Sequence, residues 1–271
     1  MLRKFKILPI VIVLGILIGW WCLKKPAGEQ LLDLRLAVVT DDGISMINIS
    51  PERRMINLVE LSGEREVWVP GGLGWYRSDR IKKLLEQEKK TDKASLILFL
   101  NYGFRPEAVL WKTEWNGELS NQELWKYWGV KQWLNYRWNS GNWLFKKEVL
   151  AVADGDEVVD EIMQRDMAET SLINQETNIT VGNASKADGL GSFVAKSLER
   201  SGLAVVDVIN VSEDFSDNCL TRKNSGDKSE WLKAMFPECK TIVDDKLENG
   251  EVEIYFGEVW AEMINYQSYN K

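Results

Sequence analysis

The sequence predicts an α/β protein, with an N-terminal transmembrane helix followed by two small mixed α/β domains. Three observations support this fold class. Residues 7–23 form an uncharged, apolar run, strand-like alternation follows around an Asp-Asp-Gly turn at 41–43, and a strand–helix–strand order recurs near the C-terminus. We therefore divide the chain as follows: an anchor at 1–25, a first α/β domain at 26–150, an acidic connector at 151–176 and a second α/β domain at 177–271.

The apolar run at 7–23 is at the short end of what spans a bilayer core, because a helix rises about 1.5 Å per residue. Three basic residues precede it, which favours a cytoplasmic N-terminus and an extracytoplasmic bulk in a single-pass protein of the cell membrane. Three other interpretations stay open: a cleaved signal peptide, a lipoprotein signal at Cys22, and a buried helix of a soluble domain. No small-x-small cleavage site follows the run, and Trp21 stands before Cys22 where a small residue is needed.

Composition excludes several kinds of chemistry. The chain has no histidine, so Ser-His-Asp and Cys-His catalysis and imidazole zinc sites are ruled out. Residues 1–150 hold 23 Lys and Arg against 17 Asp and Glu, whereas residues 151–271 hold 11 against 24. This asymmetry argues against nucleic acid as a partner of the acidic half. It also leaves the basic half beside the membrane, where anionic headgroups would attract it.

Two cysteines follow the anchor, Cys219 and Cys239, and they are 20 positions apart. Outside the cytoplasm we expect them to form a disulfide, which would stabilise the fold by about 3 kcal/mol on the chain-entropy model. Two isolated core thiols or a metal pair are the alternatives.

The first domain begins with alternating apolar residues at 34–40 and 44–49, joined by the turn at 41–43, and a third such stretch follows at 55–61. This pattern is typical of an antiparallel hairpin with a third strand. The rest of the domain is expected to contain a Gly-rich loop at 71–74, a helix at 78–90, a short apolar strand at 95–100 and a further strand within 105–115.

Seven tryptophans lie within 111–143, interleaved with basic residues on a predicted helix. Three interpretations stay open for this stretch: packing against the first domain, contact with the membrane interface, and stacking on sugar rings. The acidic residues of the connector are interpreted as the solvated face of a helix, because an Asp-Gly-Asp sequence alone does not make a calcium loop.

The second domain has the clearest pattern. A strand at 179–183 is followed by a helix that Gly202 ends and by a nearly continuous apolar strand at 203–209, as expected of a buried parallel pair. Another helix at 229–236 precedes strands at 241–243 and 251–256. This order predicts a compact α/β domain.

This segment resembles the C-terminal domain of LytR–CpsA–Psr proteins, the family of cell-wall glycopolymer ligases. The family pattern is a strand ending in Asn, a small-residue loop with Gly, a helix, a Gly and a Val-rich strand. Asn183, Gly189 and Gly202 match it, and the likeness covers residues 177–260. The region before the connector resembles a shortened, degenerate form of the same family's catalytic domain.

The resemblance implies a candidate site in that first domain. Asp42 and Glu66 would hold Mg²⁺, and Arg65 and Arg77 would bind the pyrophosphate of a polyprenyl-linked glycan. The upstream metal-binding Asp and a later Arg-x-Arg-x-Gln run of the family have no counterpart here. We therefore expect a non-catalytic binding or scaffolding protein for wall polymer, without a cofactor and with unknown protein partners. The alternative is a divergent Mg²⁺-dependent phosphotransferase that attaches glycopolymers to peptidoglycan.

Overall fold

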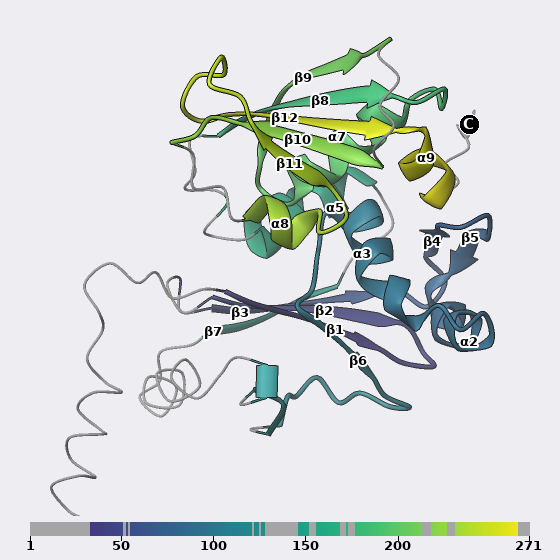
Figure 1. Ribbon diagram of the computed structural model, residues 1–271. Coiled ribbons are helices and arrows are strands. Elements are labelled where there is room, and N and C mark those ends of the chain that lie inside the picture. The colour runs from purple at the N-terminus through teal and green to yellow at the C-terminus, as the bar shows by residue number, and fades with distance from the viewer. Residues whose placement is uncertain are drawn as a thin grey trace, which may run out of the picture.

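The computed structural model is a mixed α/β structure with two five-stranded sheets, one two-stranded sheet, and helices packed between the larger sheets (Figure 1). The residues described are 33–50, 53, 55–120, 122–124, 126–127, 146–151, 156–168, 172, 177–212, 218–226 and 231–264. The predicted transmembrane helix and most of the Trp-rich stretch lie outside these residues. Within them, no helix combines the length and the apolar character needed to cross a membrane.

The first sheet has the strand order β6-β1-β2-β3-β7. Its strands are β1 (Leu34–Val39), β2 (Ile44–Ser50), β3 (Met55–Leu61), β6 (Ala108–Trp111) and β7 (Lys146–Ala151). β1, β2 and β3 pair antiparallel, which confirms the predicted hairpin and third strand. β6 and β7 add to the two sides in parallel with their neighbours, and β7 has no counterpart among the predicted strands. The Thr40 hydroxyl closes the β1–β2 turn by accepting hydrogen bonds from the amides of Asp42 and Gly43.

Alternate residues of a strand point to opposite sides of the sheet. In the first sheet both sets include apolar residues, so both faces carry apolar surface. One face carries Leu34, Leu36, Ile49 and Leu58 and belongs to a core cluster with the segment after β6. The opposite face packs under helices α2 (Ile81–Gln87), α3 (Ala94–Tyr102) and α5 (Asp156–Ile162).

The predicted strand at 95–100 is wrong, because these residues form the helix α3. Nearly every side chain of α3 is buried, since the helix lies between the two large sheets (Figure 1). A helix surrounded by apolar neighbours loses the 3.6-residue periodicity on which a helix prediction depends. The Gly-rich segment is also more ordered than expected: β4 (Glu66–Val69) and β5 (Gly74–Arg77) pair there as the two-stranded sheet.

The second sheet has the strand order β11-β10-β12-β8-β9. Its strands are β8 (Asn178–Ala184), β9 (Ala204–Asn210), β10 (Cys219–Lys223), β11 (Lys240–Val243) and β12 (Glu251–Gly257). β8 and β9 are parallel and are joined by α7 (Leu190–Arg200), as the sequence predicts. The predicted burial of β9 is wrong, because β9 lies at the edge of the sheet and most of its side chains are exposed. The predicted helix at 229–236 is found as the shorter α8 (Trp231–Met235), and β10 and α9 (Glu258–Ile264) were not predicted.

The predicted disulfide is confirmed. Cys219 begins β10 and Cys239 immediately precedes β11, and these two strands pair in parallel with Leu220 opposite Lys240. The cysteines are therefore lateral neighbours, and their Cα atoms are 4.7 Å apart. The bond closes the loop that contains α8 and fixes Phe236 against Phe99 of α3, with ring centroids 5.5 Å apart.

The C-terminus of α3 is held by side chains of α7 and of Ser201, the residue that follows α7. The last carbonyls of a helix have no partners within it. Here the carbonyl of Leu100 accepts a hydrogen bond from the Ser197 hydroxyl at 2.8 Å, and the carbonyl of Gly103 accepts one from the Ser201 hydroxyl at 2.5 Å. The guanidinium of Arg200 donates to the carbonyl of Asn101. The two large sheets are thus connected through buried polar bonds as well as apolar contacts.

Gly103 is expected to be irreplaceable at this junction. Its φ of +65° favours glycine, and an added Cβ would lie 2.4 Å from the carbonyl oxygen of Ser197 and 2.7 Å from the amide of Ser201. Gly103→Ala should therefore lower the free energy of unfolding by more than the about 1–2 kcal/mol of a left-handed alanine alone. Gly74→Ala is the matched control, since φ is +86° there and nothing lies within 4 Å. Equal losses for the two variants in urea denaturation would contradict the close approach at Gly103.

Loss of the disulfide should destabilise the second sheet. Cys219→Ser with Cys239→Ser is expected to reduce the free energy of unfolding by about 3 kcal/mol, because the unfolded chain regains the entropy of a loop of 20 residues. Urea denaturation of the wild type with and without a reductant measures the same quantity. A reductant that shifts the wild type but leaves the double-serine variant unchanged would bear this out, and an unshifted wild type would contradict it.

Candidate functional site

A pocket of about 180 Å³ lies where the two-stranded sheet, α3 and α7 meet, between the two large sheets. We call it the inter-sheet pocket. Three parts of the chain far apart in sequence contribute to it: the β4–β5 hairpin with the residue before it, the C-terminal turn of α3, and one side of α7. The lining residues are Arg65, Glu66, Trp75, Leu100, Asn101, Tyr102, Phe193, Lys196 and Arg200.

Three of these residues are cationic, and two of the cations share one acid. Asp160 of α5 forms an ion pair with Lys196 at 3.2 Å and with Arg200. The Arg200 side chain is only 9% exposed, so it is committed to Asp160 and to the carbonyl of Asn101. The side chain of Lys196 is 48% exposed and presents its charge at the opening of the pocket.

Two of the four predicted site residues, Arg65 and Glu66, line this pocket. A tight turn presents them: the amide of Arg65 donates to the carbonyl of Ser62, and the amide of Ser78 donates to the carbonyl of Arg65. Glu66 then begins β4 and is paired in register with Arg77 of β5. Two of the residues that the family resemblance implies, Arg65 and Glu66, therefore face one pocket.

Arg77 and Asp42 do not line the inter-sheet pocket. The Arg77 guanidinium forms a two-point interaction with Asp79, whose hydrogen bond and charge raise the pKa of Arg77 above its ordinary value. Asp42 lies exposed in the β1–β2 turn, where its carbonyl packs against Gly63 of the next loop. All four predicted residues are thus at one end of the first sheet, and the structure brings two of them to the pocket.

The predicted Mg²⁺ site remains a prediction. In the part of the chain that the structure describes, three or more His, Cys, Asp or Glu side chains do not gather as a metal-binding group. The carboxylates nearest the inter-sheet pocket, Glu66 and Asp160, lie among Arg65, Lys196 and Arg200. Three cations among two carboxylates favour an anion over a divalent cation.

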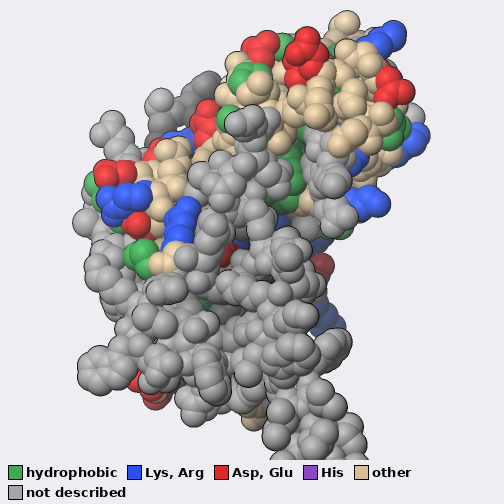
Figure 2. All heavy atoms as spheres, turned by 90° about the vertical axis from the view of Figure 1, so that its left-hand side faces the viewer, with side chains coloured by type: hydrophobic (Ala, Val, Ile, Leu, Met, Phe, Trp, Pro, Cys, Tyr) green, Lys and Arg blue, Asp and Glu red, His purple; other side chains and the backbone are tan. Residues whose placement is uncertain are grey.

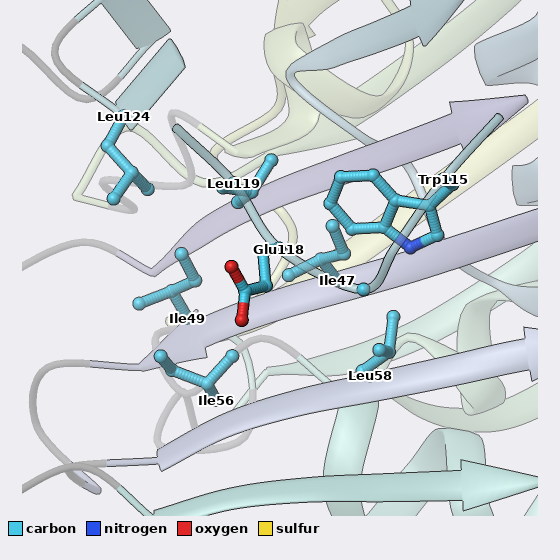
Figure 3. Close-up of a pocket in the computed structure, with 9 residues that line it drawn as sticks. Ile47, Ile49, Ile56, Leu58, Trp115, Glu118, Leu119 and Leu124 are labelled. Carbon is cyan, nitrogen blue, oxygen red and sulfur yellow. The ribbon is translucent and has the colours of Figure 1, made fainter. Parts of the chain in front are cut away.

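A second pocket, of about 170 Å³, lies on the opposite face of the first sheet (Figure 3). We call it the sheet-face pocket. Strands β2 and β3 supply an aliphatic floor, and the segment 115–124, which we call the strap, supplies the wall. The lining residues are Ile47, Ile49, Ile56, Leu58, Trp115, Gly117, Glu118, Leu119 and Leu124. None of the four predicted site residues contributes to it.

The strap is fixed by a capping arrangement around Glu123. Its carboxylate accepts hydrogen bonds from the amide and hydroxyl of Ser120 at 2.7 and 2.8 Å, and it forms an ion pair with Lys112 at 2.8 Å. The amide of Glu123 in turn donates to the Ser120 hydroxyl at 3.2 Å, and this reciprocal pattern is a capping box. Burial would raise the pKa of Glu123, but the hydrogen bonds from Lys112 and Ser120 outweigh it and leave that pKa below the ordinary value.

Comparison with known proteins gives no identity to this chain. No protein-family model matches it, and no curated protein or solved structure is significantly similar to it. The functional interpretation therefore depends on the two pockets and on the sequence.

Several lining residues were not identified from the sequence. Phe193, Lys196 and Arg200 follow a spacing of three and four residues, which places them on one side of a helix, and this signal was available. Their meeting with Arg65 and Glu66 was not predictable, because it depends on how α7 packs against α3. Trp75 gave no signal beyond its position after a Gly-rich stretch.

The ion pair at Glu123 should hold the strap in place only while the carboxyl is charged. Because its pKa is lowered by folding, its contribution is complete above the unfolded value of about 4.3 and is lost as the pH falls through the folded value. Glu123→Gln should therefore accelerate amide hydrogen exchange in the strap by about tenfold at pH 7, and by much less near pH 3. Glu118→Gln, an exposed change on the same strap, is the control. Equal exchange in the two variants at pH 7 would contradict the role of Glu123.

Proposed function

We propose that this chain is a membrane-anchored, extracytoplasmic protein of the cell envelope that binds an anionic glycan in the inter-sheet pocket and does not catalyse its transfer. The observation that carries the proposal is the composition of this pocket. Arg65 and Lys196 supply positive charge, and Trp75 and Phe193 supply aromatic surface, in one concave site. Cations suit phosphate or carboxylate groups, and aromatic faces suit the apolar faces of sugar rings.

The location in the envelope is supported by the sequence. The apolar run at 7–23 with its preceding basic residues favours a signal anchor, and a disulfide between Cys219 and Cys239 is typical of an oxidising compartment. The resemblance of residues 177–260 to the C-terminal domain of LytR–CpsA–Psr proteins agrees with this location, since that family is also tethered outside the membrane. Wall polymer is the anionic glycan that such a location would offer.

Nucleic acid is not favoured as the anionic ligand. The half of the chain that carries α7 has 24 acidic against 11 basic residues. On the face in Figure 2, acidic and basic side chains are interspersed over the described atoms. A nucleic-acid interface needs a continuous basic stripe, whereas an anionic sugar needs only a few convergent groups.

A divergent Mg²⁺-dependent phosphotransferase acting on polyprenyl-pyrophosphate-linked glycan is the second candidate. It is favoured by Arg65 and Glu66, which line the same pocket. It is disfavoured by Arg77, which is occupied by Asp79, and by Asp42, which lies in an exposed turn. Binding without transfer accounts for both observations.

Affinity for an anionic glycan should depend on Arg65 and Lys196. With the full chain in nanodiscs, Arg65→Gln and Lys196→Gln are each expected to weaken binding of a glycerol-phosphate oligomer roughly tenfold, the size of a lost charge-assisted hydrogen bond. Binding should also weaken with added salt, because Lys196 is half exposed. Titration calorimetry measures both effects.

Lys83→Gln on α2 is the matched control, since it removes an exposed lysine away from the pocket. A neutral oligosaccharide of the same length shows whether charge is recognised. If Lys83→Gln weakens binding as much as Lys196→Gln, the inter-sheet pocket is not the site. If Mg²⁺-dependent transfer from a polyprenyl-pyrophosphate-linked glycan to peptidoglycan occurs and is lost in Arg65→Gln, the chain is a transferase and the non-catalytic proposal is overturned.

A further inference from the structure

The sheet-face pocket is built to receive apolar material. Its floor consists of branched aliphatic side chains from β2 and β3, and its wall includes Trp115, Leu119 and Leu124 (Figure 3). An apolar cavity of about 150 Å³ stays free of water and binds a molecule of the size of benzene. The sheet-face pocket, at about 170 Å³, accordingly has room for a short stretch of hydrocarbon.

The lining favours an occupant through apolar contacts. The indole N–H of Trp115 has no hydrogen-bond partner among the described residues, but this nitrogen is buried out of reach of a molecule in the pocket. The occupant that fits the aliphatic floor and the wall is therefore a hydrocarbon chain.

The carboxylate of Glu118 limits the charge of the headgroup that can lie at the sheet-face pocket. Glu118 is exposed on the strap, and its carboxylate lies over the same pocket (Figure 3). The neighbouring cation Lys112 is paired with Glu123 and also lies 4.6 Å from the Trp115 ring centre. No cation of the described residues pairs with Glu118, so its carboxylate would repel an anionic headgroup more than a neutral or zwitterionic one.

The course of the chain places this pocket near the predicted membrane surface. Leu34 at the start of β1 pairs with Ile49 of β2, and Ile49 lines the pocket. Only residues 24–33 separate β1 from the apolar run at 7–23, and ten residues extend at most about 35 Å. Since the chain enters the first sheet beside the pocket, a bilayer that holds the anchor lies within that reach.

We propose that the sheet-face pocket binds an acyl chain of a bilayer lipid with a neutral or zwitterionic headgroup. Only the source of the chain rests on the membrane anchoring proposed above; the pocket itself is independent of the anionic-glycan site on the other face of the sheet. Binding of this kind holds the first sheet against the bilayer and leaves the inter-sheet pocket facing away from it.

Photo-crosslinking tests this directly. The full chain is placed in nanodiscs that contain phosphatidylcholine with a diazirine in its acyl chain, and labelled peptides are mapped by mass spectrometry. We expect label on peptides that carry Ile56, Leu58 and Leu119, in addition to any label on the apolar run at 7–23. Leu119→Trp fills the pocket and should reduce the label on Ile56 and Leu58 at least fivefold.

Leu73→Trp is the matched control, because Leu73 is an equally half-buried leucine in the β4–β5 turn. It should leave the label unchanged. In addition, Glu118→Gln should raise labelling by a phosphatidylglycerol probe toward the level of the phosphatidylcholine probe. The proposal would be overturned if the label were confined to the apolar run at 7–23. It would also be overturned if Leu119→Trp and the wild type were labelled equally. Glycan titration of Leu119→Trp separates the two sites. If the variant loses the lipid label but keeps its affinity for the glycan, the two pockets act independently.

Discussion

The structure depends on one helix that is buried on every side. Leu96, Phe99 and Leu100 of α3 belong to the core of the second sheet, while Ile97, Leu98 and Tyr102 belong to the core of the first sheet. Since both cores use the same helix, neither sheet can move without exposing apolar surface of the other. The carbonyls at the end of α3 make this contact directional, because they accept hydrogen bonds from Ser197 and Arg200 of α7 and from Ser201, which follows α7.

This arrangement also determines what the residues of the inter-sheet pocket can do. Arg200 lines the pocket, yet its guanidinium is already bonded to Asp160 and to the end of α3. Its removal would take one of two cations from the partly exposed carboxylate of Asp160 and leave the carbonyl of Asn101 without this donor, so its first role is structural. Lys196 is one helical turn away and half exposed, so it can exchange its contact with Asp160 for a ligand at little cost. Arg200 orders the pocket, and the proposed affinity for an anionic ligand depends on Lys196 and Arg65.

The sequence predicted those parts of the fold that have a local signal. The Asp-Asp-Gly turn and the alternation around it led to the β1–β2 hairpin, and Gly202 and the valine-rich stretch after it led to β9. Helix α3 was missed because its two-sided burial removes the periodicity of a surface helix. β10 was missed because Cys219–Lys223 contains polar and charged residues and lacks a run of apolar ones. It forms a strand by pairing with β11 and β12, which come later in the sequence. The candidate site was also predicted only where the sequence has a local signal. Arg65 and Glu66 were identified from a local motif. Lys196 was not, because it reaches them through the packing of α7 on α3.

The first sheet separates two chemically different pockets. Its face toward α3 leads to a pocket lined by cations and aromatic rings, and its other face forms the floor of a pocket lined mainly by aliphatic side chains. A transferase acting on a lipid-linked glycan would need the lipid and the phosphate in one continuous site, because the reacting phosphate lies at the end of the lipid chain. Here the two pockets share no lining residue and the first sheet separates them, so they do not form one continuous site. Two separate ligands can occupy them, and the proposed binding of lipid on one face and glycan on the other uses this division directly.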